Sequence, residues 1–143
     1  MQNTGQNKNF VLVIYLILAV VGLSMIIVGS LFQNITIPKE QQDFSHYLNY
    51  NFTKPVGTAF FIVAIVLGYF LKVNPLIAGL CMFSVFPLTS LIEIMIDGTS
   101  HNLLPFEIAM YIVYALPSIF GLYLGRLIAQ RSAKKKVKNI GEG

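Results

Sequence analysis

The chain has 143 residues, of which 55 % are hydrophobic and only 11 % are charged, and its mean hydropathy is +0.69. Soluble domains average about 45–50 % apolar and about 25 % charged residues, so this composition is typical of a membrane protein. A soluble enzyme domain is nearly excluded, because the longest polar stretch, residues 33–54, is shorter than the roughly 40 residues that a self-folding core needs. These features define a class of protein and leave its biochemical activity open.

Four long apolar runs lie along the sequence, each close to the length of one transmembrane helix. A helix needs roughly 20 residues to cross ~30 Å of hydrocarbon, and membrane strands would alternate in polarity, which these runs do not. The sequence therefore predicts a single all-α integral membrane domain, an up-down bundle of four transmembrane helices at residues 10–32, 55–73, 75–96 and 105–128. The first run is longer than the ~7–15-residue core of a signal peptide, so we expect it to be a retained span.

Lysine and arginine residues lie mainly on one side of the predicted membrane. With a cytoplasmic N-terminus, eight basic residues are cytoplasmic and only Lys39 and Lys54 lie outside. This bias predicts a multi-pass protein of the cell (inner) membrane with both termini in the cytoplasm. The basic tail, residues 129–143, is expected to attract anionic headgroups of the lipid bilayer at ~1 kcal/mol per charge, and no nucleic-acid partner is expected.

The outer loop, residues 33–54, contains a short amphipathic segment. Phe44, Tyr47 and Leu48 recur at three- and four-residue spacing, which indicates one apolar stripe. A short helix lying on the membrane surface fits this pattern, and an irregular loop with scattered aromatic side chains is the alternative.

Short links and small residues indicate how the spans pack. The links after the second and third spans are so short that the second and third spans should form an antiparallel hairpin and the fourth should lie beside them. Gly121, Gly125 and Ala129 form a ridge of small residues on the fourth span, which lets another helix approach closely, within this chain or in a second protomer. Pro87 and Pro117 favour kinks in the third and fourth spans.

One cluster of polar and ionisable residues surrounds the turn between the last two spans, and it is the candidate polar site. Two or three carboxylates with an imidazole could bind a divalent cation or share a proton. The members of this site are Glu93, Asp97, His101, Asn102 and Glu107. We expect the last four to form one hydrogen-bonded group at the outer surface, with Glu93 pointing toward it from the third span. The alternative is structural: Glu93 lies ~27 Å along its helix, near the membrane boundary, where a carboxylate is less costly than at the midplane.

Catalytic motifs are missing from the sequence, which contains no HExxH, no glycine-rich phosphate loop and no GxSxG elbow. Cys81 is the single cysteine, so a disulfide within the chain and a cysteine-based metal site are ruled out. We therefore expect neither an enzyme nor a cofactor, and no metal site is assigned.

The tract DGTSHNLLPFE at residues 97–107 resembles one found in small four-span bacterial membrane proteins. The resemblance covers these 11 residues together with the number of spans and the basic tail. It implies a bacterial membrane protein of this class, to which no activity is assigned.

Three functional hypotheses follow. The first is an accessory or structural membrane component that acts through helix packing, as a homo-oligomer or with a larger membrane partner. The alternative is a small oligomeric transporter or channel that uses the acidic and histidine side chains as an outer-mouth site. Its weakness is that transporters place their sites near the midplane, which is apolar in these spans. A membrane-embedded enzyme acting on lipid is the third, and no nucleophile–base arrangement supports it.

Overall fold

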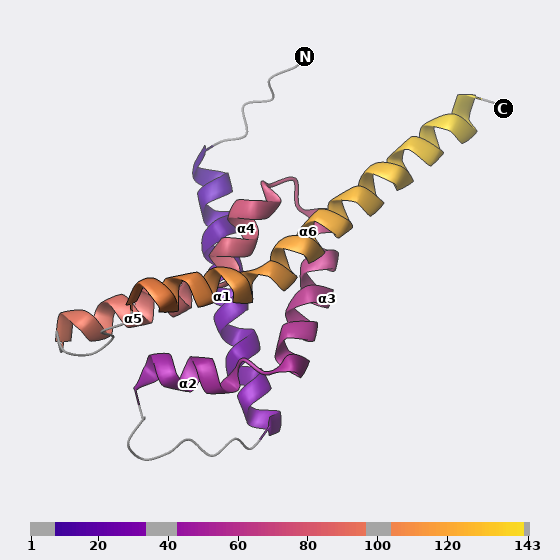
Figure 1. The fold of residues 1–143 in the computed structure, drawn as a ribbon. Coiled ribbons are helices and arrows are strands. Elements are labelled where there is room, and N and C mark those ends of the chain that lie inside the picture. Colours follow the sequence, from indigo (N-terminus) through magenta and orange to yellow (C-terminus); the bar gives the residue numbers. More distant parts are fainter. Residues whose placement is uncertain (1–7, 34–42, 97–103, 142–143) are drawn as a thin grey trace.

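The computed structural model describes residues 8–33, 43–96 and 104–141, and in these ranges the chain folds into helices joined by short links, without strands (Figure 1). The helices are α1 (Lys8–Gln33), α2 (Phe44–Asn51), α3 (Lys54–Phe70), α4 (Pro75–Met82), α5 (Val85–Ile96) and α6 (Leu104–Gly141).

Two of these helices are each long and apolar enough to cross a membrane, and two further spans are bent pairs. The long helices are α1 and α6; α2 and α3 form one pair, bent by 81°, and α4 and α5 form the other, bent by 49°. The predicted all-helical fold is confirmed, with up to four spans in the described part of the chain. The last helix continues to Gly141, past the predicted end of the fourth span at residue 128, so most of the basic tail extends α6.

The short helix predicted in the outer loop is present as α2, but its apolar stripe faces the protein. Leu48 is fully buried, and the hydroxyls of Tyr47 and Ser30 lie 2.5 Å apart, linking α2 to α1. Phe44 stacks on Tyr47 and remains half exposed. Since α1 and α5 both contact α2, the stripe contributes mainly to the packing of this chain.

The break between α4 and α5 lies one turn before Pro87. A proline ring clashes with the carbonyl four residues earlier, and here that carbonyl belongs to Phe83, the C-cap residue of α4. The Ser84 hydroxyl donates to the Cys81 carbonyl at 2.8 Å, which satisfies an acceptor that the break frees. Pro87 itself lies in the first turn of α5, where the missing amide hydrogen has no helical partner to lose.

The most extensive helix packing is between α3 and α6. A Cβ added at Gly121 would lie 2.5 Å from the Phe61 carbonyl oxygen, and one at Gly125 would lie 2.8 Å from the Tyr69 amide nitrogen. Gly68 on α3 likewise lies against the α6 backbone at Leu122. Small residues on both helices therefore allow the two backbones to touch.

The predicted hairpin of the second and third spans does not form an extensive contact. Both α3 and α4 pack mainly on α6, and α4 also packs on α1. Gly79 lies against Ile119 where α4 crosses α6, and Gly22 lies against Met82 where α1 meets α4. The glycines at these crossings favour α6 and α1 as partners of α4, so the short link between α3 and α4 fixes their order but not their contact.

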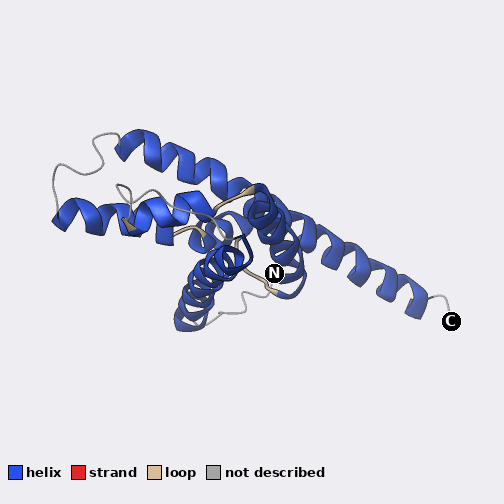
Figure 2. Cartoon of the chain, turned by 90° about the horizontal axis from the view of Figure 1, so that it is seen from below, coloured by secondary structure: helices blue, strands red, loops and turns tan. Residues whose placement is uncertain are grey.

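Aromatic rings fill the space where the two helix breaks meet. Phe52 at the end of α2 and Phe83 at the end of α4 are in edge-to-face contact, with ring centroids 5.1 Å apart. Phe60, Phe86 and Tyr114 complete the cluster from α3, α5 and α6. Beyond it, α2, α5 and the first part of α6 extend to one side of the molecule and the basic end of α6 to the other (Figure 2).

Candidate functional site

Glu93 on α5 acts as a cap for the start of α2. Its Oε1 accepts a hydrogen bond of 2.9 Å from the backbone amide of Ser45, in the first turn of α2, where helical amides lack intrahelical partners. Asp43 occupies the N-cap position but makes no side-chain cap bond. The carboxylate of α5 therefore takes over this role, and it also faces the positive end of the α2 dipole.

Glu107 belongs to a second set of polar contacts, centred on Tyr111. The Tyr111 hydroxyl donates to Glu107 Oε2 at 3.4 Å and lies 2.8 Å from the Ser90 hydroxyl of α5. The side chain of Asn49 on α2 also lies close to Tyr111. Because Ser90 and Tyr111 are buried, their mutual hydrogen bond offsets the cost of removing both hydroxyls from water.

The structure describes two carboxylates of the candidate polar site, those of Glu93 and Glu107, and α2 links them. Ser45 contacts Glu93 and Asn49 contacts Tyr111, and these α2 residues are four apart, on one face of the helix. Asp97, His101 and Asn102 lie outside the described residues, so the expected group around the turn stays a prediction.

Sequence reasoning missed Ser45, Asn49 and Tyr111 as members of this network. Helical spacing could have found Tyr111, which lies four residues after Glu107 and hence on the same helix face. The two α2 residues carry no comparable signal, because Ser45 is 48 residues from Glu93 and Asn49 is 62 residues from Tyr111.

The network is best suited to holding helices together. Glu93 and Glu107 each accept a hydrogen bond from this chain, and the described residues include no group of three or more His, Cys, Asp or Glu that could hold a metal ion. The atoms that meet here are those of a packed joint between α2, α5 and α6.

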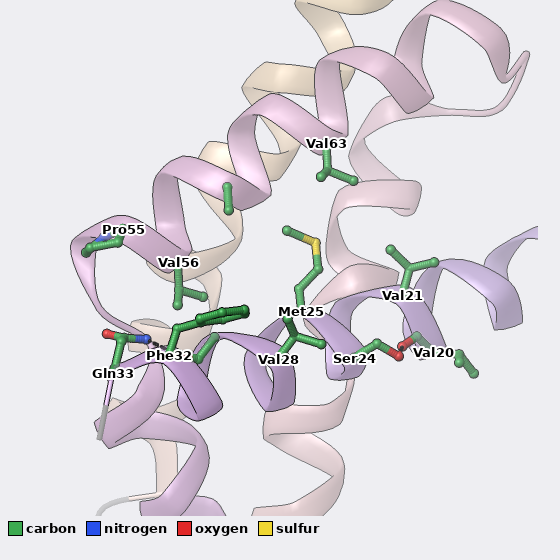
Figure 3. Close-up of a pocket in the computed structure, with 12 residues that line it drawn as sticks. Val20, Val21, Ser24, Met25, Val28, Phe32, Gln33, Pro55, Val56 and Val63 are labelled. Atoms are coloured by element: carbon green, nitrogen blue, oxygen red, sulfur yellow. Dashed lines mark hydrogen bonds between the residues drawn. The ribbon is translucent and has the colours of Figure 1, made fainter. Parts of the chain in front are cut away.

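An apolar groove of about 550 Å³ runs between α1 and α3. Val20, Met25 and Val28 of α1 face Val56 and Val63 of α3 across it (Figure 3). Gln33 closes one end, where it accepts a hydrogen bond from the Thr53 hydroxyl and donates to the Gly29 carbonyl at 3.0 Å. The lining is almost wholly apolar, so this groove is suited to contact with an apolar surface.

A basic hollow of about 310 Å³ lies between the end of α3 and the middle of α6. Lys72, Arg126 and Gln130 supply its polar wall, and Gly68 and Ala129 are among its small residues. Ala129, predicted as part of the packing ridge, lines this hollow, whereas Gly121 and Gly125 lie against the α3 backbone.

In comparisons with known proteins, no family model, curated protein or solved structure matches this chain. Its function therefore has to be argued from its own residues.

Proposed function

We propose that this chain is an accessory or structural component of a membrane, acting through the packing of its helices. The surface of α1 carries this proposal, because only 17 % of its most apolar 18-residue stretch is buried within the chain. Leu12, Leu16 and Val20 are each about 60 % exposed. Such an apolar surface needs lipid or another apolar helix around it, because its exposure to water is energetically unfavourable.

The proposed partners are the lipid bilayer and a second copy of the chain or a larger membrane protein. The contacts of Glu93 and Glu107 support a structural role, because both carboxylates bind donors of the same chain. The resemblance of residues 97–107 to a tract of small four-span bacterial membrane proteins agrees with this role and with a bacterial origin. An enzymatic activity is not part of the proposal.

We further propose that both termini are cytoplasmic in the cell (inner) membrane. The start of α1 and the end of α6 lie toward the same end of the molecule (Figure 1). Lys72, in the link between α3 and α4, lies beside Arg126 of α6 at this end. The excess of basic residues there agrees with the positive-inside rule.

The test is the mass of the assembly together with its permeability. Native mass measurement of the purified full chain in mild detergent should give a homo-oligomer, or co-purification from native membranes should give one defined partner. Liposomes that contain the chain should show no ion or solute flux above empty liposomes. A monomer without a partner, accompanied by flux, would contradict the proposal.

A small oligomeric transporter or channel is the second candidate, favoured by one observation. The breaks after α2 and α4 meet at Phe52 and Phe83, and discontinuous helices are typical of transporter sites. In this proposal Glu93, Asp97, His101 and Glu107 would line an outer mouth. Reconstituted flux should then fall in Glu93→Gln and His101→Ala, and flux that these substitutions leave unchanged would refute the candidate.

A further inference from the structure

The basic hollow between α3 and α6 combines two kinds of wall. Lys72 and Arg126 bring two positive charges, and Tyr69 and Gln130 add groups that can donate hydrogen bonds. Gly68, Leu71, Ala129 and Ala133 form the apolar remainder. Its volume of about 310 Å³ lies at the lower end of the ~300–1,000 Å³ found for small-molecule sites.

The two cations of this basic hollow are not neutralised within the part of the chain that the structure describes. No acidic residue lines the hollow, and the ion pair recorded among the described residues joins His46 to Asp43 on α2. Both Lys72 and Arg126 are exposed. The hollow therefore presents an uncompensated charge of about +2, which favours an anionic ligand.

The position of the hollow along the helices matches a membrane boundary. Arg126 follows Pro105 by 21 residues, which corresponds to ~31 Å of helix, close to the ~30 Å thickness of the hydrocarbon layer. The last residue of α3, Phe70, follows Pro55 by 15 residues, or ~23 Å of helix, and Lys72 lies just beyond it. A phosphate bound at this depth would lie where the lipid headgroups begin.

We propose that the basic hollow of Lys72, Arg126 and Gln130 is a binding site for the phosphate headgroup of one anionic phospholipid. The guanidinium and ammonium groups bind the phosphate oxygens, and the Gln130 amide donates an additional hydrogen bond. The first carbons of the lipid pack on Leu71 and the Tyr69 ring. A free phosphate ion uses only the charged wall, whereas a phospholipid uses both, so the mixed lining favours the lipid. This site differs from diffuse attraction to the tail, because its lysine comes from the link after α3 and its arginine from α6.

The test is native mass spectrometry of the delipidated full chain titrated with phosphatidylglycerol, with phosphatidylcholine as the neutral comparison. The wild-type chain should bind one phosphatidylglycerol well before further ones. Since each basic residue near a headgroup contributes roughly a fivefold gain in affinity, the double variant Lys72→Gln/Arg126→Gln should bind this lipid about 25-fold more weakly. The matched control Lys134→Gln/Lys135→Gln removes the same charge from α6 outside the hollow and should retain the first lipid.

A second variant tests the shape of the hollow without changing its charge. Ala133→Leu should obstruct the hollow and weaken the first binding step, while Ala109→Leu, at an exposed position in the other half of α6, should not. Leucine is a good helix former, so both variants should keep the helix. If the double variant fails to fold, the comparison of these two variants still tests whether the lipid binds in the hollow.

Three results would overturn the proposal. An equal loss of lipid binding in the hollow and tail variants would mean diffuse attraction, and no loss in either would mean that the hollow takes no lipid. Displacement of the lipid by inorganic phosphate would mean a free-phosphate site. This site rests on the proposed membrane placement. If the wild-type chain bound phosphatidylglycerol and phosphatidylcholine equally well, while its oligomer and its impermeable liposomes were as expected, the lipid site would be refuted and the proposed function would stand.

Discussion

Glycine residues determine how closely α3 and α6 can approach. At Gly125 an added methyl group would collide with the α3 backbone at Ile65 and Tyr69, whereas at Gly57 it would meet only the Phe52 ring, at 3.7 Å. Both glycines lie inside helices, so the same substitution at the two sites separates backbone contact from helix propensity.

We expect Gly125→Ala to lower the free energy of unfolding by about 1–3 kcal/mol, the usual cost of overpacking a close contact. Gly57→Ala should instead be neutral or raise it by up to about 1 kcal/mol, because alanine is the better helix former. Reversible unfolding of the purified chain in mixed micelles measures both. Equal effects at the two positions would contradict the close approach of α3 and α6.

The side chain of Glu93 holds the start of α2 through one carboxylate oxygen, which accepts a hydrogen bond from the Ser45 amide. Glu93→Ala should destabilise the chain by about 1–3 kcal/mol, because the amide at the start of α2 loses its acceptor. Glu93→Gln keeps an acceptor oxygen and should cost clearly less.

Hydrogen exchange of the α2 amides measures the local effect of these two substitutions. Exchange should accelerate in Glu93→Ala and stay near the wild-type rate in Glu93→Gln. If exchange accelerates equally in both variants, the negative charge rather than the hydrogen bond holds α2 in place.

At the scale of elements, proline accounts for the break between α4 and α5. Pro87→Ala removes the clash with the Phe83 carbonyl, so α4 and α5, bent by 49°, should approach one continuous helix. Spin labels at the exposed positions Leu76 and Met95 should then move apart, since a straight helix is longer end to end than a bent pair. Pulsed electron paramagnetic resonance on a Cys81→Ser background measures this distance.

Pro117 provides the control for that experiment. It lies within the continuous helix α6, so Pro117→Ala should leave the distance between the labels on α4 and α5 unchanged. An unchanged distance in Pro87→Ala as well would mean that the aromatic cluster around Phe83, rather than the proline, maintains the bend.

At the scale of the whole molecule, Lys72 of the α3–α4 link and Arg126 of α6 line the same hollow, and the start of α1 and the end of α6 lie toward the same end of the molecule (Figure 1). We expect a green fluorescent protein fused to the C-terminus to fluoresce, and an alkaline phosphatase fused there to be inactive, because both termini should be cytoplasmic. Insertion of the same reporters after residue 42, in the outer loop, should give the opposite pattern. An active phosphatase at the C-terminus would reverse the proposed topology.

Composition and local pattern were sufficient to predict an all-helical chain with up to four apolar spans, a short helix before α3 and a bend near Pro87. These features depend on how each segment meets lipid or on a backbone clash within one turn, so nearby residues determine them. Candidate site residues could be found in the same way only where they share a helix face, as Glu107 and Tyr111 do.

Tertiary structure decided which helices and polar groups meet. Glu93 contacts Ser45 across 48 residues of sequence, and α3 packs on α6 rather than on α4, which follows it directly. Helical periodicity predicts the face on which a side chain lies, but the partner of that face depends on which surfaces fit. Gly68, Gly121 and Gly125 bring the α3 and α6 backbones into contact, and this complementarity arises only when the two helices are together in space.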